Sequence, residues 1–297
     1  MSEQKTKLSV TMEPSLSSIL SDEDMEALRA AGLKYLALPA AFYDLGEEKV
    51  RARWEILARM GFVADTCHPP FGGGNQKNSL CAEDEAVRAQ TIETYRHYIR
   101  AFKWTGMRAI PVHTGGAMHP AGGKKALARL TDTLRQILPD AKDSHVILAL
   151  ENTFYMNPCP FSDAKNPSGI DQKYINDDCA MLRDYVRAFG DENVRICHDA
   201  GHSILFSNDL THDLSCLWAD TVLYHLHDND GVDDLHFNVG AGAFPWDTLR
   251  AFFREHPPVC PVYDEVLNDP DKAMVTALKR PDRVIYYYRQ ACETLNG

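Results

Sequence analysis

Short apolar runs alternate with segments of helical spacing along most of the chain. The eight apolar runs that we predict to be β-strands are Lys7–Met12, Tyr35–Pro39, Phe62–Thr66, Met107–Val112, His145–Leu150, Val194–Cys197, Thr221–Tyr224 and Val259–Tyr263. The segments that we predict to be helices are Ser21–Gly32, Glu47–Met60, Glu83–Thr105, Lys124–Leu138, Asp177–Phe189, Leu210–Trp218, Trp246–Arg254 and Lys272–Leu295. Strands that alternate with helices at roughly 35 residues per unit predict a parallel sheet with helical crossovers.

The number of these units and the length of 297 residues favour an α/β fold, a closed (β/α)8 TIM barrel. We predict one domain over residues 1–297, with residues 1–6 as a flexible tail. An open doubly wound sheet is the alternative, but it favours a G-x-G-x-x-G turn after the first strand, and that turn is missing. Residues 154–171 form the longest irregular segment, whose length is typical of a functional lid.

Composition narrows the classes of function. The chain has 42 acidic and 31 basic residues, a net charge of −11, which argues against a nucleic-acid binder that depends on phosphate contacts. Its 8 cysteines include no pair with C-x-x-C spacing, and we recognise no secretory leader in the sequence. We therefore expect reduced thiols and a cytoplasmic protein. No apolar run approaches the ~18 residues that cross a bilayer, so we expect no membrane span.

Residues 224–244 contain the densest group of candidate metal ligands. His225, His227 and His236 lie among four aspartates in this stretch, directly after an apolar run. Neutral imidazole and carboxylate oxygen are the usual protein ligands of a borderline-soft divalent cation. A solvated acidic loop that happens to contain three histidines is the alternative interpretation.

Similar residues follow the C-terminal ends of other predicted strands. In a barrel these ends converge on one rim, although they are far apart in the chain. The residues in these positions are His68, His113, Glu151, Asp199, His202, His225, His227, Asp234, His236 and Glu265. We therefore predict one metal site at the rim. Taken singly, the loop histidines could be satisfied by backbone groups, and Asp199 could cap a helix.

The alternation of side chains along an extended segment separates neighbouring candidates. It favours Glu265 over Asp264 as the residue that faces the site, and it makes His198 a structural residue that points away. His225 and His227 lie two positions apart and face the same way. We favour His225 as the ligand, which leaves His227 as a second ligand or a substrate contact.

The ordered motifs resemble those of the xylose isomerase-like TIM-barrel superfamily, and they run through nearly the whole chain. The motifs are Cys67-His-Pro-Pro-Phe71, Val112-His-Thr-Gly-Gly116, Leu150-Glu-Asn152, His198-Asp-Ala-Gly-His202, His225-Leu-His-Asp-Asn-Asp-Gly231, Asp234-Leu-His236 and Gly240-Ala-Gly242. That superfamily holds sugar and sugar-phosphate isomerases and epimerases, inosose dehydratase-like enzymes, and endonuclease IV, an apurinic-site nuclease with three zinc ions.

The resemblance implies a ligand set. Ketose 3-epimerases of the superfamily bind one divalent ion through two Glu, one Asp and one His, which correspond to Glu151, Glu265, Asp199 and either His225 or His227. The ion would be Zn2+ or Mn2+, with Mg2+ or Co2+ as alternatives. The same resemblance implies that Glu151 and Glu265 are the catalytic pair that transfers a proton next to a metal-polarised carbonyl.

The remaining candidates also match ligands of endonuclease IV, which would use them for a second and a third zinc. These residues are His68, His113, His202, Asp234 and His236. A hydrolase with several metal ions is therefore one alternative function. An inosose dehydratase-like lyase and a sugar-binding protein without turnover are two others.

The composition of the loops at the rim favours a carbohydrate enzyme over a nuclease. Residues 68–80, 113–123, 151–171 and 228–244 contain no Arg and few Lys, whereas gripping DNA phosphates requires such cations. Aromatic residues of the kind that pack on a sugar are present instead, namely Phe71, Phe154, Tyr155 and Trp246. We predict substrate contacts from His68, Phe71, His113, Asn152, His202 and Trp246. The expected function is isomerisation or epimerisation of a sugar, sugar phosphate or polyol, and a homo-oligomer is an open alternative because relatives are often dimers or tetramers.

Overall fold

The computed structural model describes residues 5–11, 21–70, 77–114, 123–153, 178–206, 209–265 and 281–297. Its strands are β1 (Leu8–Thr11), β2 (Tyr35–Ala37), β3 (Val63–Thr66), β4 (Ala109–Val112), β5 (Ile147–Glu151), β6 (Val194–Asp199), β7 (Thr221–Leu226) and β8 (Val262–Asp264). Its helices are α2 (Asp22–Ala30), α3 (Ala40–Tyr43), α4 (Glu47–Arg59), α5 (Glu85–Phe102), α6 (Gly123–Asp143), α7 (Cys179–Phe189), α8 (Ala200–Phe206), α9 (Leu210–Leu217), α10 (Trp246–Glu255) and α11 (Pro281–Asn296). A 3-10 helix covers Trp218–Asp220.

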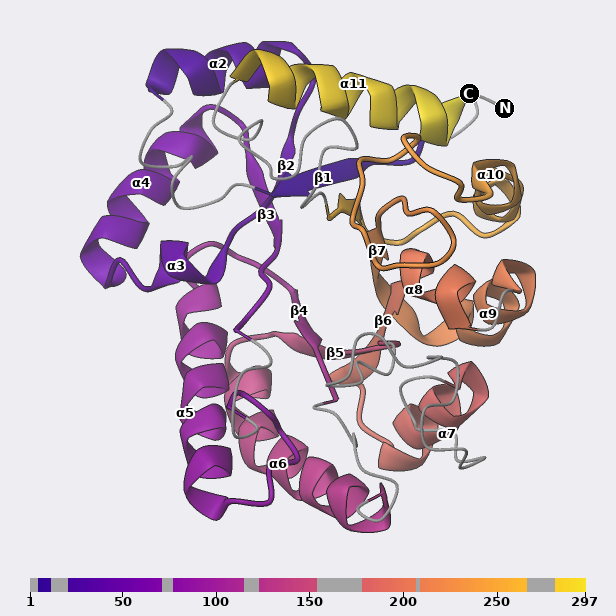
Figure 1. The fold of residues 1–297 in the computed structure, drawn as a ribbon. Coiled ribbons are helices and arrows are strands. Elements are labelled where there is room, and N and C mark those ends of the chain that lie inside the picture. The colour runs from indigo at the N-terminus through magenta and orange to yellow at the C-terminus, as the bar shows by residue number, and fades with distance from the viewer. Residues whose placement is uncertain are drawn as a thin grey trace.

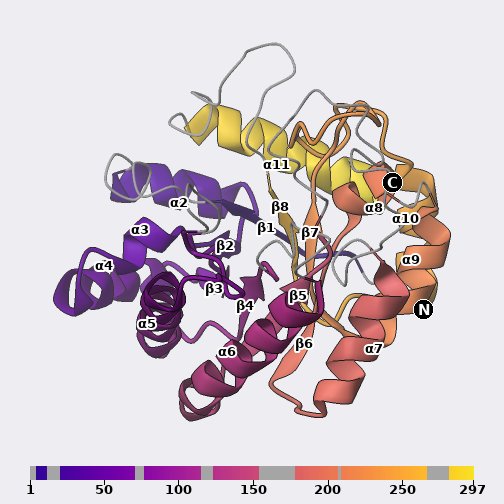
Figure 2. The same cartoon turned by 60° about the horizontal axis from the view of Figure 1, so that its bottom comes forward.

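The strands form one eight-stranded sheet in the order β3-β2-β1-β8-β7-β6-β5-β4, and every hydrogen-bonded pair is parallel. The first strand pairs with the last, and β3 and β4 at the two ends of this order lie in contact. The result is a nearly closed barrel with helices around it (Figures 1 and 2). The predicted (β/α)8 architecture is therefore confirmed, and the open doubly wound alternative is excluded.

The barrel forms because most positions along its strands are buried. One face fills the barrel interior and the other packs under the helices, so β4 is buried at all four positions and β5 at every position but its first. Buried side chains of the helical shell, such as Leu28, Leu57, Ile99 and Leu134, complete the core. α11 packs beside α2 and closes the shell near the first strand (Figure 1).

Local signals in the sequence explain where several helices begin. Ser21 and Asp24 form a reciprocal capping box at α2, as the Ser-x-x-Asp pattern predicts. Asp84 and Asp178 cap α5 and α7 by accepting backbone N–H groups. These polar caps turn the chain from each loop into the helix that follows.

The structure differs from the sequence-based boundaries in a few places. β6 and β7 each continue two residues beyond the predicted end, so candidate ligands lie within the strands rather than in loops. α8 is not predicted from the sequence, because its first residues, Ala200 and Gly201, are more typical of a loop. β8 begins at Val262 rather than Val259, since Pro261 cannot donate to a strand ladder.

The two ends of the described chain are tied together. Thr6, which the sequence analysis assigns to a flexible tail, donates its backbone N–H to Asn296 at 2.7 Å. The first part of the predicted closing helix, residues 272–280, and the predicted lid at 154–171 lie outside the described residues. Among the helices that are described, none is both long and apolar enough to cross a membrane.

Candidate metal centre

The strands of the barrel carry the candidate ligands to one rim. Glu151 is the last residue of β5 and Asp199 the last of β6, while Glu265 directly follows β8. The parallel register places Asp199 beside His225 of β7. Because parallel strands all point the same way, their ends meet on one face of the barrel, and all four side chains are buried there.

Glu151, Asp199, His225 and Glu265 form the first group, which we call the carboxylate centre. The Nδ1 atom of His225 lies 2.9 Å from Oε2 of Glu265, 3.6 Å from Oε1 of Glu151 and 4.0 Å from Oδ2 of Asp199. Three carboxylates thus surround one imidazole nitrogen. The structure thus brings together two Glu, one Asp and one His, the residue types that the family resemblance implies, and their role as ligands stays a prediction.

Two histidines lie on one side of the carboxylate centre. The Nε2 atoms of His68 and His113 are 3.1 Å apart. His113 Nε2 also lies 3.3 Å from Oε2 of Glu151, and His68 Nε2 lies 3.8 Å from Oε1 of Glu265. This histidine pair therefore faces the two glutamates.

The other side holds a second group, His202, His227, Asp234 and His236, which we call the loop cluster. Asp234 lies at its middle, 3.6 Å from His202, 3.5 Å from His227 and 3.1 Å from His236. Asp199 joins the two groups, because its carboxylate lies 3.2 Å from His227 Nε2 and 3.5 Å from His202 Nδ1. All ten residues predicted as ligands consequently belong to one connected cluster.

His225 and His227 fall into different groups. The chain leaves the β7 strand after Leu226, so the two rings do not share one environment. His225 faces Glu265, whereas His227 stacks on His236 with ring centroids 4.0 Å apart and an interplanar angle of 15°. The structure thus gives both histidines a place among the candidate ligands.

The donor atoms of this cluster fit a divalent cation. Several of them are buried and form no hydrogen bond of acceptable geometry with the described residues, although ionisable neighbours lie close: Oε2 of Glu151 and Glu265, Oδ2 of Asp199, Oδ1 of Asp234, and both ring nitrogens of His225 and His227. Buried polar atoms are normally paired, and leaving them unpaired is costly. Five overlapping sets of three or four residues have ligand atoms within 4.8 Å of one another. Imidazole and carboxylate together suit zinc or manganese.

The charges of the cluster depend on one another. Burial opposes ionisation of Glu151 and Glu265. Even so, His113 and His225 hold the pKa of Glu151 below its usual value, and His225 does the same for Glu265. Burial likewise disfavours the charged form of His202, yet the adjacent Asp199 and Asp234 raise its pKa to about 10. Protons on the histidines thus balance the carboxylates, and a bound cation would take over that balance.

His68 behaves differently, because burial lowers its pKa to about 4 despite the nearby Glu265. Its ring is therefore neutral at physiological pH. Neutral imidazole is the form that binds a metal ion or accepts a hydrogen bond from a substrate.

Two residues that the sequence analysis assigns to substrate binding have other partners. Asn152 donates to the Asp199 carbonyl at 2.8 Å and accepts the Asp199 N–H at 2.7 Å, so its amide joins the ends of β5 and β6. Trp246 donates its indole N–H to Asp228 at 2.7 Å. Substrate contact by either residue stays a prediction. Their hydrogen bonds show that both side chains join segments of the protein to each other. Phe71, Phe154 and Tyr155 lie outside the described residues.

Two further residues complete the picture. His198 pairs with Ser203 at 2.9 Å, in agreement with the structural role expected of it. Cys197, which the sequence analysis does not single out, lies within ligand distance of Glu151 and His225. Its position two residues before Asp199 on the same strand is the signal that could have revealed it.

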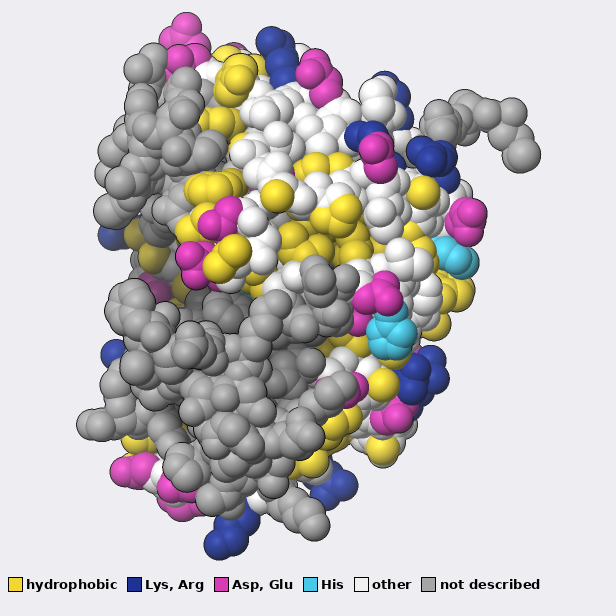
Figure 3. All heavy atoms as spheres, turned by 45° about the vertical axis from the view of Figure 1, so that its right-hand side comes forward, with side chains coloured by type: hydrophobic (Ala, Val, Ile, Leu, Met, Phe, Trp, Pro, Cys, Tyr) yellow, Lys and Arg dark blue, Asp and Glu magenta, His cyan; other side chains and the backbone are white. Residues whose placement is uncertain are grey.

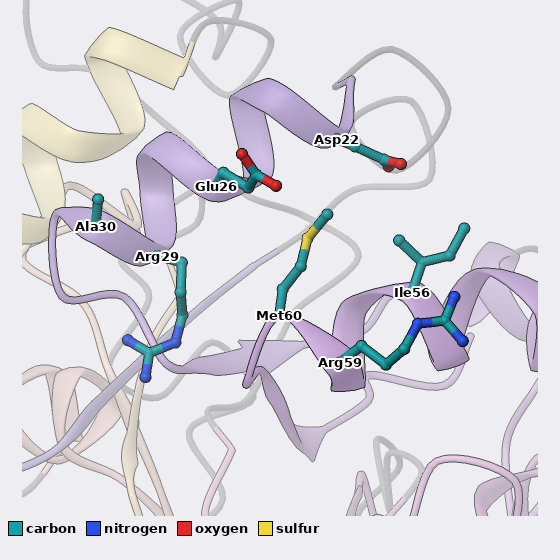
Figure 4. Close-up of a pocket in the computed structure, with 7 residues that line it drawn as sticks. All are labelled: Asp22, Glu26, Arg29, Ala30, Ile56, Arg59 and Met60. Atoms are coloured by element: carbon teal, nitrogen blue, oxygen red, sulfur yellow. The ribbon is translucent and has the colours of Figure 1, made fainter.

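A separate depression lies between α2 and α4 on the outside of the helical shell. It is lined by Asp22, Glu26, Arg29, Ala30, Ile56, Arg59 and Met60 and measures about 800 Å³ (Figure 4). None of the candidate ligands lines it. The chemistry of the rim and this surface depression are therefore distinct features.

Comparisons with known proteins agree with this architecture. The model of the xylose isomerase-like TIM barrel family matches residues 25–278. A solved D-psicose 3-epimerase is 14% identical, with 98% of this chain and 100% of that chain covered and a TM-score of 0.71. A 3-keto-D-glucoside 4-epimerase from E. coli is 15% identical over 96% and 100% of the two chains, with a TM-score of 0.70.

The TTHB071 protein of Thermus thermophilus, solved after soaking with ZnCl2, is 21% identical over 97% of this chain and 98% of that chain, with a TM-score of 0.63. No curated protein matches the chain. At these identities the solved structures show the shared fold, while the family model covers most of the sequence. The chain therefore belongs to the xylose isomerase-like TIM barrel family.

Proposed function

We propose that the protein is a divalent-metal-dependent isomerase or epimerase of a sugar, sugar phosphate or polyol. The observation that carries the proposal is the carboxylate centre, where Glu151 and Glu265 converge on His225 beside Asp199 in a buried position at the barrel rim. Solved structures with the same fold include a D-psicose 3-epimerase and a 3-keto-D-glucoside 4-epimerase, which supports this class of reaction.

The residues of the carboxylate centre would hold the cation, which would polarise a substrate carbonyl and so make the neighbouring C–H bond more acidic. Glu151 and Glu265 would transfer the proton. Because the pKa of each is held below its usual value, both carboxylates are ionised and either can accept a carbon-bound proton. The other glutamate would first take a proton from a neighbouring imidazolium, such as His202 beside Glu151, or from water, and would then donate it to the opposite face of the same carbon.

The histidines around the glutamates would orient the substrate. His113 lies 3.3 Å from the Oε2 atom of Glu151 and can pass a proton to that oxygen or hold a substrate hydroxyl beside it. His202 lies near the other carboxylate oxygen of Glu151, 3.6 Å from Oε1. Hydrogen bonds from both rings would fix the plane of the reacting carbons between the two carboxylates.

The proposal is tested by Glu265→Gln, assayed on a panel of ketoses, aldoses, their phosphates and cyclic polyols. Loss of the proton-transfer group should lower kcat by roughly 10²–10⁴-fold. The matched control is Asp264→Asn. Asp264 is the neighbouring buried carboxyl, and burial raises its pKa well above the usual value, so a neutral amide of nearly the same shape is a mild change there. A wild-type protein that converts no member of the panel would contradict the proposal, as would unchanged turnover in Glu265→Gln.

A second candidate function is a hydrolase with more than one metal ion. The observation that favours it is the loop cluster, which provides ligand atoms of His202, His227, Asp234 and His236 within 4.8 Å of one another beside the carboxylate centre. The net charge of −11 argues against a nucleic-acid substrate, and on the face drawn in Figure 3 the Lys and Arg side chains lie apart near the margins rather than in one basic patch. Incision of abasic duplex DNA at low salt would favour the hydrolase, and one bound ion per chain with sugar turnover would exclude it.

A further inference from the structure

Asp228 is a fully buried carboxylate that does not belong to the candidate metal ligands. Its Oδ1 accepts the backbone N–H of Phe244 at 2.8 Å and that of the adjacent Asn229 at 3.0 Å. Its Oδ2 accepts the indole N–H of Trp246 at 2.7 Å and the backbone N–H of Gly240 at 3.2 Å. Four N–H donors thus surround one buried carboxylate, which is the arrangement that makes its burial tolerable.

These hydrogen bonds fold residues 228–246 back on themselves. Asp228 and Phe237 exchange two backbone hydrogen bonds, at 2.7 and 2.8 Å, and form an antiparallel bridge. A Cβ atom on Gly242 would overlap the Asp228 carboxylate and the Asn229 carbonyl. Gly240 adopts a φ of +88°. The Gly240-Ala-Gly242 motif is therefore what allows the backbone to close over Asp228.

The folded segment carries two members of the loop cluster, Asp234 and His236. His236 has a φ of 48°, a left-handed conformation that side chains other than Gly rarely adopt, and its Nδ1 lies 3.1 Å from the Glu265 carbonyl. Asn229 donates to the Gly201 carbonyl at 3.3 Å and so ties the same segment to the start of α8, which carries His202. The contacts of Asp228 therefore join the two ends of the segment that carries Asp234 and His236.

We propose that Asp228 is a positioning residue that holds the loop cluster in its metal-binding arrangement without touching the ion. The inference rests on a divalent ion bound at the loop cluster, the ligand group that the second candidate function would use. Its physical basis is that Asp234 and His236 are held on a loop rather than on a strand. The loop keeps its shape because N–H groups from both of its ends converge on one carboxylate.

The central experiment is Co2+ titration of purified Asp228→Asn, followed by the visible absorption of bound Co2+. An amide offers one acceptor oxygen and places an NH2 donor against the N–H groups of Gly240 and Trp246. The affinity at the loop cluster should fall about 10- to 100-fold, which is typical when a residue that orients metal ligands is lost. Asp230→Asn is the matched control, because Asp230 lies in the same segment, is exposed and accepts only neighbouring backbone N–H groups.

A double-mutant cycle separates positioning from a general loss of stability. His236→Ala alone should weaken Co2+ binding, and adding Asp228→Asn should cause little further loss, since both changes disable the same cluster. Additive losses would overturn the inference, as would unchanged affinity in Asp228→Asn. If Asp228→Asn does not fold, Trp246→Phe removes one donor to Asp228 and should weaken binding at the loop cluster by a smaller factor, whereas unchanged binding overturns the inference.

A readout without metal keeps this inference distinct from the proposed function. In the metal-free protein, hydrogen exchange at the backbone N–H groups of Gly240 and Phe244 should become faster in Asp228→Asn and stay unchanged in Asp230→Asn. Wild-type protein that binds no divalent ion would overturn the proposed function. Unaltered exchange at Gly240 and Phe244 would overturn the positioning role whether or not a metal binds.

Discussion

Glycine at position 201 shows how closely single residues are constrained at the rim. A Cβ atom there would overlap the imidazole of His227, which lies only 3.2 Å from Asp199. Gly201→Ala should therefore displace the ring and cost about 1–3 kcal/mol of unfolding free energy, as overpacking does. Urea denaturation measures this loss. The double variant Gly201→Ala with His227→Ala should recover most of it, and a loss that persists in the double variant would show that the ring is not the cause.

Asp65 gives a pH-dependent prediction at a second residue. Burial raises its pKa to about 6, while Ser9, which donates to its Oδ2 at 2.5 Å, and Arg108 act in the opposite direction. Because the folded pKa lies above the unfolded one, this carboxyl stabilises the fold at pH 4 relative to pH 7, and the contribution is lost as pH rises through 6.

Asp65→Asn has no proton to lose. The difference in unfolding free energy between Asp65→Asn and the wild type should therefore move in favour of the variant by about 1–3 kcal/mol when the pH is raised from 4 to 7. This figure follows from the shift in the pKa of Asp65. Urea unfolding at the two pH values, with both proteins freed of metal by a chelator, measures the difference. The exposed Asp143→Asn is the control. A gap between variant and wild type that is the same at both pH values would contradict the assignment.

Residue-level alternation predicts part of the candidate site well. Glu265 faces His225, whereas the adjacent Asp264 is buried elsewhere, as expected for neighbours on an extended segment. The same rule does not separate His225 from His227, because it assumes a strand that in fact ends at Leu226. The partners of Asn152 and Trp246 could not be predicted either, since both depend on residues distant in the sequence.

At the scale of elements, helix caps are the signals that act most locally. Asp84 accepts the backbone N–H groups of Ala86 at 2.8 Å and Val87 at 3.3 Å at the start of α5. Asp84→Ala should lower the free energy of unfolding by about 1 kcal/mol. Asp84→Asn should lower it much less, because the Asn side chain can still accept these hydrogen bonds. Thermal or urea unfolding distinguishes the two. Equal losses in both variants would mean that the charge, and not the cap, stabilises α5.

Element boundaries near the site were harder to predict than the elements themselves. The ends of β6 and β7 have the composition of polar loops because Asp199 and His225 are ligand-type residues, yet both lie within the strands. α8 begins directly after Asp199, whose Oδ1 accepts the His202 N–H at 2.8 Å. Asp199 is therefore a helix cap as well as a candidate ligand, and these two interpretations do not exclude each other.

At the scale of the whole molecule, the periodicity predicts the barrel because eight strand-and-helix units leave few other ways to bury both faces of each strand. The convergence of ten side chains on one rim follows from that topology. The number of cations they hold does not follow from it, since that depends on ångström-scale spacing between loops.

Removal of metal should affect the entire fold. Ligand binding to the native state alone contributes about 2.7 kcal/mol when the free ion is at 100 times its Kd. Purified protein treated with a chelator should melt at a lower temperature, and Zn2+ or Mn2+ should restore it. Asp199→Asn should show a much smaller metal-dependent shift, because Asp199 joins both ligand groups. If the wild-type melting temperature is the same before and after treatment with a chelator, the native state does not bind a stabilising metal ion.

The most direct test of the central claim is anomalous diffraction from crystals of the wild-type protein, measured at the zinc and manganese absorption edges. The account predicts a peak within about 2.0–2.3 Å of the donor atoms of Glu151, Asp199, His225 and Glu265. A crystal grown with saturating metal that shows no peak among these residues, or a peak only elsewhere on the molecule, would contradict it.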